Sequence, residues 1–191
     1  MNKWSKLRAL ALAAALFIAL GATRDTLAYY TVIGTATNVV TSGNITLKVH
    51  EKTGDGQPFP EQGVRVRPGD KVSKEVMVEN TCTQPFYLRV GLVNGVEQAT
   101  LPVEGVFSFD VDAANWTYRE DGYYYYNSIL QPGQITPALL REVEIVRNKV
   151  GVQFSGRTLT LTVTAQAVQS KNNPADHPWE ASGWPEEGRQ A

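Results

Sequence analysis

The chain has 191 residues, with 18 lysines and arginines against 19 aspartates and glutamates. This length suits one domain, and the nearly balanced charge argues against nucleic acid as a partner. Cys82 is the one cysteine of the sequence, which excludes an internal disulfide framework. We expect its thiol to pack as a small hydrophobic group, with an intermolecular disulfide as the alternative.

Residues 1–28 have the pattern of a secretory signal peptide. Basic residues open the segment, and an apolar run over residues 9–22 follows. The run is too short for a confident membrane span, which needs about 20 residues. Thr26 and Ala28 are suited to the −3 and −1 positions of a cleavage site, so we predict a cut between Ala28 and Tyr29. The pattern predicts a secreted or cell-surface protein that contacts a membrane only before cleavage; an uncleaved anchor is the alternative.

Residues 29–40 follow the predicted cut directly and have the pattern of an extended strand. The segment is rich in β-branched residues and contains no proline. Tyr30, Val32, Gly34 and Ala36 occupy alternate positions, so they would share one face of the strand. The predicted strand therefore begins at the new N-terminus, with no spacer before it.

After this segment, short runs of alternating apolar and polar residues recur up to residue 169. A period of two predicts strands with one buried face and one wet face. Such strands suit an antiparallel sheet that packs one face on a core. The runs are Ile45–Val49, Val76–Val78, Phe86–Leu92, Phe107–Val111, Val143–Ile145 and Leu159–Ala167.

Turn sequences separate these runs. They are Thr53–Gly56, Arg67–Asp70, Val93–Gly95 and Gln131–Gly133. No long helical period occurs among them, so we predict that residues 29–169 form an all-β domain, a single jelly-roll-like antiparallel β-sandwich. Residues 170–191 are rich in proline, glutamate, asparagine and glycine, which predicts a polar C-terminal tail. Trp179 and Trp184 in this tail are candidates for docking on the domain.

The sequence offers few groups for catalysis. Its two histidines, His50 and His177, belong neither to a His-Glu-x-x-His motif nor to a close cluster of histidine and cysteine. No serine lies in a Gly-x-Ser-x-Gly context. We therefore expect no catalytic residues, no metal site and no cofactor.

Several charged residues are interpreted as solvated surface groups. Lys71 and Lys74, beside Glu75, have this interpretation. So do two carboxylate pairs on the outward faces of predicted strands, for which acid–base catalysis or calcium binding is the alternative. The pairs are Asp110 with Asp112 and Glu142 with Glu144.

Four consecutive tyrosines give one stretch the most unusual composition in the chain. In a strand, Tyr123 and Tyr125 would face one side, and Tyr124 and Tyr126 the other. Packing across strands is one interpretation of this run. A carbohydrate-binding surface and a subunit interface are the other two.

Four phrases, taken in order along the chain, point to a family. They are TLAYYTVIGTATNVVTSGNITLKVHE (residues 26–51), VRPGDKVSKEVMVENTCTQPFYLRV (66–90), DGYYYYNSILQPGQITPALLREVEI (121–145) and AQAVQSKNNPADHPWEASGW (165–184). Together they resemble the TasA/camelysin family of exported proteins from Gram-positive bacteria, which a SipW-type signal peptidase processes.

This resemblance implies a jelly-roll-like β-sandwich exported to the cell surface, the extracellular matrix or the spore coat. In fibre-forming members, the mature N-terminal strand of one subunit fills a gap in the next, which requires an extended segment with alternating side chains. For this chain it implies assembly with identical or related exported subunits, after cleavage by a dedicated signal peptidase. The candidate assembly residues, within the strand predicted over residues 29–40, are Tyr29, Tyr30, Val32, Gly34 and Ala36.

Two classes of function stay open at this point. The first is a non-enzymatic structural subunit of a matrix, surface or spore-coat-associated fibre. The second is a secreted peptidase of the camelysin type or a polysaccharide-binding β-sandwich, although the sequence contains no recognisable ligand set for a metallopeptidase. For residues 29–40, an ordinary intramolecular edge strand or a disordered end is the alternative to an exchanged strand.

Overall fold

The computed structural model describes residues 30–38, 45–97 and 101–185, and within β1 it describes the side chains of residues 30–32. Strands dominate this part of the chain, joined by loops and two short 3-10 segments, η1 (Val152–Phe154) and η2 (Pro178–Glu180). The predicted all-β sandwich is therefore confirmed. No helix among the described residues is long and apolar enough to cross a membrane. The predicted signal peptide and its cleavage site lie outside the described residues.

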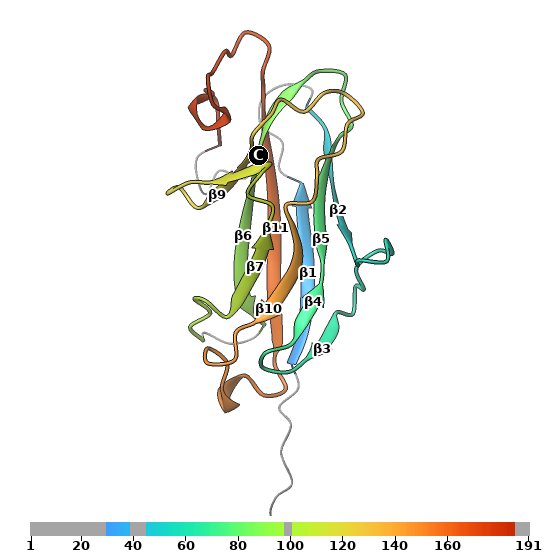
Figure 1. The fold of residues 1–191 in the computed structure, drawn as a ribbon, viewed down its shortest axis with the longest axis vertical. Helices are drawn as coiled ribbons and strands as arrows, with labels where there is room; N and C mark the ends of the chain where they lie inside the picture. The colour runs from blue at the N-terminus through green and yellow to red at the C-terminus, as the bar shows by residue number, and fades with distance from the viewer. Residues whose placement is uncertain (1–29, 39–44, 98–100, 186–191) are drawn as a thin grey trace, which may run out of the picture.

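One layer of the sandwich is a six-stranded sheet in the order β3-β1-β11-β6-β9-β8. The longest strands, β11 and β6, lie at its centre and pair antiparallel along eleven residues. The sheet runs the length of the molecule (Figure 1). Its strands are β1 (Tyr30–Asn38), β3 (Val64–Val66), β6 (Phe86–Val96), β8 (Trp116–Tyr118), β9 (Tyr123–Tyr126) and β11 (Thr158–Gln169).

The opposing layer contains a three-stranded sheet, β4-β10-β7, and a two-stranded sheet, β2-β5. A backbone hydrogen bond from Leu139 N to Val76 O, 2.7 Å long, joins β5 to the segment before β10. A second bond, from Lys74 N to Arg141 O, continues this junction. The strands are β2 (Leu47–Lys52), β4 (Lys71–Ser73), β5 (Glu75–Asn80), β7 (Phe107–Val111) and β10 (Leu140–Ile145).

The core lies between these layers and follows the predicted alternation. Along β11, five alternate side chains are fully buried, whereas the intervening threonines at 158, 160, 162 and 164 are half-buried on the other face. Val76 and Val78 of β5 likewise face the core. The buried β11 residues are Leu159, Leu161, Val163, Ala165 and Ala167.

One predicted turn is wrong. Val93–Gly95 continues β6, where Asn94 pairs with Leu161 and Gly95 pairs with Thr160 of β11. A Cβ atom at Gly95 would lie 2.5 Å from the Thr160 hydroxyl oxygen, so the glycine makes room for its cross-strand neighbour rather than turning the chain. The other three predicted turns lie outside the strands.

The antiparallel pattern has one exception, because β1 runs parallel to β11. Parallel neighbours need a long crossover connection. Here almost the whole domain forms that connection, since the first and the last strand lie side by side (Figure 1). On its other side, β1 pairs antiparallel with β3.

Candidate functional site

The candidate assembly strand forms β1, which lies inside the six-stranded sheet. It pairs with β11 at eight positions and with β3 at three. Within the single chain β1 is thus an intramolecular strand, as in the alternative to exchange; β3 pairs with it at residues 30–32, and among the described residues no strand pairing is found on that side of residues 33–38. Of the five candidate residues, Tyr29 lies outside the described part of the chain.

Tyr30 and Val32 anchor β1 in the core. Their exposed fractions are 1% and 0%, so they share a buried face as predicted. The Tyr30 hydroxyl donates a hydrogen bond of 3.3 Å to the carbonyl oxygen of Gly151, and burial raises the pKa of Tyr30 above its ordinary value. Gly34 and Ala36 continue the same register further along β11. The strand therefore fills a defined slot between β3 and β11.

The slot has two chemical components. Its walls offer the backbone hydrogen-bonding groups of β3 and β11, which are costly to bury without partners. Its floor is apolar, because Leu159 and Leu161 on β11 and Val66 on β3 are buried beside it. An extended segment with alternating apolar side chains satisfies both components.

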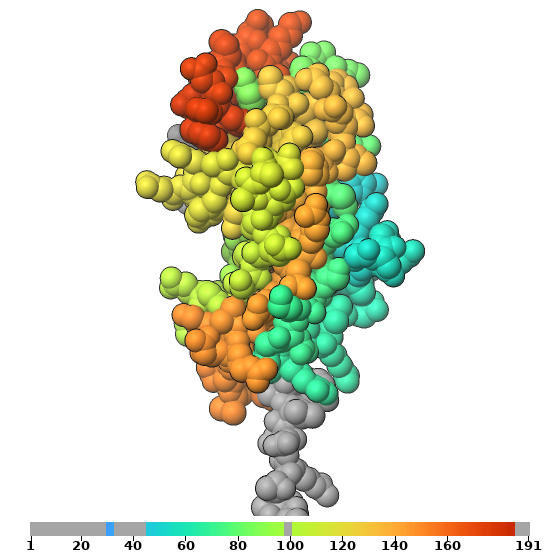
Figure 2. Space-filling model, viewed as in Figure 1, coloured from blue at the N-terminus to red at the C-terminus, as the bar shows by residue number. Residues whose placement is uncertain are grey.

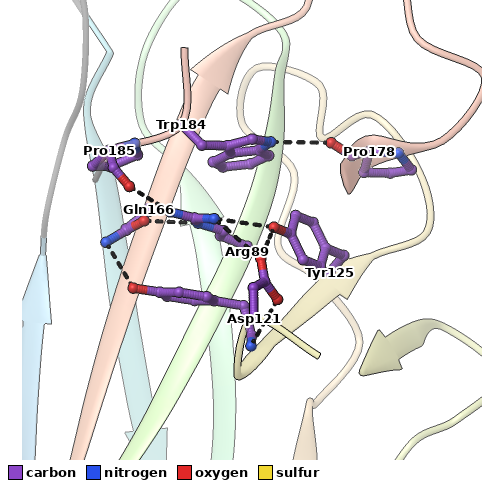
Figure 3. Close-up of polar contacts among 8 residues, drawn as sticks. Arg89, Asp121, Tyr125, Gln166, Pro178, Trp184 and Pro185 are labelled. Carbon is purple, nitrogen blue, oxygen red and sulfur yellow. Dashed lines mark hydrogen bonds and ion pairs between the residues drawn. The ribbon is translucent and has the colours of Figure 1, made fainter. Parts of the chain in front are cut away.

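A second site, which the sequence did not predict, surrounds Arg89 on β6. Its Nε donates a hydrogen bond of 2.8 Å to Gln166 Oε1. Its Nη1 donates to the Tyr125 hydroxyl at 3.0 Å, and its Nη2 donates to the carbonyl oxygen of Pro185 at 2.7 Å. Figure 3 shows these contacts converging from β6, β9, β11 and the C-terminal segment. The guanidinium is thereby satisfied although the residue is only 6% exposed.

Aromatic rings enclose the same guanidinium. The Arg89 Cζ lies 3.9 Å from the ring centroid of Tyr123 and 4.8 Å from that of Trp184. Tyr125 meets Trp184 edge-on, with 5.5 Å between centroids. Burial raises the pKa of Tyr125 to about 12; its hydrogen bond to Asp121 adds to the rise, and Arg89 opposes it.

These contacts fix the C-terminal segment to the domain. The predicted docking of Trp179 and Trp184 is confirmed, since both rings contact Tyr125. Ala181 is also buried, against Tyr87 and Val168. Residues 170–185 therefore form a packed cover over one end of the six-stranded sheet rather than a free tail.

The tyrosine run divides between the two faces of β9 as predicted. Tyr123 and Tyr125 join the Arg89 site, whereas Tyr124 and Tyr126 lie on the opposite face. There the ring of Tyr124 lies 4.8 Å from that of Tyr118 on β8, centroid to centroid, with the two rings tilted by 48°, and Tyr118 is 59% exposed. The segment around β9 protrudes from the body of the molecule (Figure 2).

Lys74 is not a surface charge, and this interpretation is corrected. Its side chain is fully buried, with Nζ 2.6 Å from Glu51 Oε1 and 4.0 Å from the centroid of the Phe59 ring. The position lies between β4 and β5, where the chain passes from the three-stranded to the two-stranded sheet. By contrast, Lys71 is exposed as predicted and pairs with Glu142 at the surface.

Of the other candidate polar residues, Asp110, Glu142 and Glu144 line one surface pocket with Lys71, whereas the two histidines lie apart. His50 contacts Glu79 across β2 and β5 at 2.8 Å, and His177 stacks on Trp179 in the C-terminal segment. Asp112 accepts a hydrogen bond from Asn115, which is the main cause of its lowered pKa. Among the described residues, no group of three or more histidine, cysteine, aspartate or glutamate side chains could hold a metal ion.

Comparisons with known proteins give no relative from which a function could be transferred. No family model, no curated protein and no solved structure matches this chain. The functional argument therefore rests on the structure itself, and above all on the slot occupied by β1.

Proposed function

We propose that this protein is a secreted structural subunit of an extracellular matrix, surface or spore-coat-associated fibre, and that copies assemble by exchanging β1. The carrying observation is the position of β1 in a slot between β3 and β11. A second copy of β1 offers the same backbone groups and the same side chains as the first. The slot therefore accepts a strand from its own chain or from a neighbour through identical contacts.

Two features of β1 support this proposal. The predicted cut after Ala28 places the mature N-terminus one residue before the strand begins at Tyr30. The N-terminal end of β1 is then free, and its C-terminal end connects to the domain only through residues 39–44. The strand can leave its slot without breaking any other strand pair.

N-terminal sequencing of the secreted protein should give Tyr29 as its first residue; any other end contradicts the predicted processing.

A disulfide across β1 and β3 tests the exchange directly. Thr31 pairs with Arg65 in the β1–β3 register, so Thr31→Cys with Arg65→Cys places two thiols on adjacent strands. Cys82→Ser removes the native thiol from this background. Monomers oxidised before assembly should stay monomeric, and reduction should restore assembly. Assemblies oxidised after formation should instead give covalent ladders on non-reducing gels.

A matched pair of cysteines provides the control. Lys48 pairs with Glu79 across β2 and β5, within one domain whatever β1 does. Lys48→Cys with Glu79→Cys should therefore give no ladder. If the oxidised β1–β3 variant assembles as readily as its reduced form, exchange of β1 is wrong. If no form of the mature protein assembles, the structural-subunit function is wrong as well.

Polysaccharide binding is a second candidate function, favoured by the exposed ring of Tyr118, which lies against Tyr124. Tyrosine rings stack on the apolar faces of sugar rings. The C-terminal segment packs over Tyr125, so Tyr118, at 59% exposure, is the tyrosine that we expect a polymer to contact. Tyr118→Ala should abolish co-sedimentation with purified cell-wall polymer, whereas Val93→Ala, at another exposed apolar position, should not. Equal retention by both variants would exclude this surface.

A further inference from the structure

The C-terminal end of β1 and the N-terminal end of β2, which residues 39–46 connect, lie at the same end of the sandwich. β1 ends at Asn38, opposite Ala165, and the described chain resumes at Ile45, which is buried in the core. β2 then starts at Leu47, opposite Asn80. We call this end the hinge end; it lies at the top of Figure 1. Its surface comprises residues 79–86 and 128–136 and the last residues of β11, together with the start of the C-terminal segment, whose Ser170 and Ala175 line a surface pocket with Ile129.

The short connection limits how far an exchanged strand can lie from its own domain. Residues 39–44 separate Asn38 from Ile45, and seven fully extended peptide units span about 25 Å. In an exchanged pair, Asn38 lies in the slot of the acceptor, whereas Ile45 stays in the core of the donor. The hinge ends of the two copies must therefore lie within about 25 Å of each other. Copies stacked through opposite ends of the sandwich would exceed this reach.

The hinge end carries exposed apolar side chains that suit such a contact. Ile135 is 52% exposed and Ile129 is 39% exposed. Both lie in the segment before β10. The backbone of Ile135 bridges to Glu79, and Leu130, which follows Ile129, bridges to Phe86.

A buried side chain holds this segment in place. The Asn80 Nδ2 donates hydrogen bonds of 2.9 Å to the carbonyl oxygens of Gln84 and Leu130. Gly133 N donates to the Asn80 carbonyl oxygen, also at 2.9 Å. The isoleucines are thus presented from a hydrogen-bonded loop, which lowers the conformational entropy lost when a partner covers them.

We propose that copies of this chain associate through their hinge ends, with Ile129 and Ile135 of each copy packed against the other copy. This inference rests on the proposed exchange of β1. It adds a geometry to that function: neighbouring copies meet through the same surface, and the opposite end, with η1, faces away from the contact. A continuing exchange of β1 from copy to copy then gathers the hinge ends around a common axis.

Single cysteines at the two ends test this geometry in a Cys82→Ser background. Gln131 is exposed at the hinge end, and Val152 is 88% exposed in η1 at the opposite end. A short bis-maleimide should couple Gln131→Cys chains into covalent pairs and leave Val152→Cys chains uncoupled. Ile135→Asp should weaken association about tenfold or more, whereas Val152→Asp should leave it unchanged.

The outcomes separate this inference from the proposed function. If assemblies of the oxidised β1–β3 cysteine variant give ladders but Gln131→Cys chains do not couple, exchange stands and hinge-end contact is overturned. Coupling through Val152→Cys in place of Gln131→Cys also overturns it. If no ladder forms at all, exchange and hinge-end contact fall together. Ladders with coupling at Gln131→Cys, and with weakened association of Ile135→Asp, support both.

Discussion

Replacing Lys74 by methionine should destabilise the fold far more than the same change at an exposed lysine. Lys74→Met leaves the Glu51 carboxylate, in a side chain that is 13% exposed, without its cation. Removing one partner of a buried ion pair leaves an uncompensated buried charge, which typically costs about 3 to 5 kcal/mol. We therefore expect the free energy of unfolding at pH 7 to fall by about 3 to 5 kcal/mol.

Urea titrations followed by circular dichroism would measure this change, with two matched variants. Lys71→Met removes a lysine whose Nζ also lies 2.6 Å from a glutamate oxygen, but at the surface, so it should leave stability nearly unchanged. Lys74→Met with Glu51→Leu removes both charges and should restore the wild-type value to within about 1 kcal/mol. Equal losses at Lys71 and Lys74, or a double variant as unstable as the single one, would refute the reasoning.

The pH dependence gives an independent test of the same pair. Burial lowers the pKa of Lys74 from its ordinary value of 10.5, although Glu51 acts in the opposite direction. The unfolded chain therefore binds this proton more tightly than the folded chain. Between the lowered value and 10.5, the free energy of unfolding of the wild type should rise with pH relative to Lys74→Met. A difference that stays flat or falls over this window contradicts a buried ammonium.

Three other predictions follow from the core and from the Arg89 site. Leu161→Asp should prevent folding, while Thr162→Asp should change the free energy of unfolding by about 1 kcal/mol or less. If urea titrations give the two variants equal losses of stability, our assignment of the buried and outward faces is wrong. Arg89→Met should lower the free energy of unfolding by about 2 to 4 kcal/mol and speed proteolytic release of the C-terminal segment. An unchanged rate of cleavage would contradict the proposed role of Arg89 in holding that segment. With its pKa raised from 10.0 to about 12, Tyr125 holds its proton more tightly in the folded chain, so stability is lost as the pH rises above 10.0. In an absorbance titration, Tyr125→Phe should lose one of the tyrosines that ionise late in the wild type.

Alternation of side chains predicted the strands well where one face is apolar along the whole run. β11 is the clearest case, because its threonines and its aliphatic residues differ sharply in hydropathy. The prediction of a turn at Val93–Gly95 failed. It relied on an asparagine followed by a glycine, which is a local turn signal. The opposing β11 register, contributed by a strand far along the chain, overrides it.

The candidate sites were predictable only in part, for a related reason. Tyr30 and Val32 were placed on one face by local spacing, and this face is buried. Arg89 stands at an outward strand position and becomes buried only because residues 170–185 fold back over it. Lys74 becomes buried where the chain changes sheets, which alternation along a single strand does not encode. Each failure depends on a contact between segments that are far apart in the sequence.

The parallel pairing of the first and last strands also sets the order in which the domain can form. Thr31 pairs with Thr158, so the partner of β1 is made only when most of the chain has been synthesised. Contacts of such sequence separation close the longest loops and form slowly. Until then the side of β1 that pairs with β11 is an open strand edge, which is prone to aggregation. If the chain is exported unfolded, as its proposed function requires, β1 and β11 would pair only after crossing the membrane, on the side where we propose that the copies assemble.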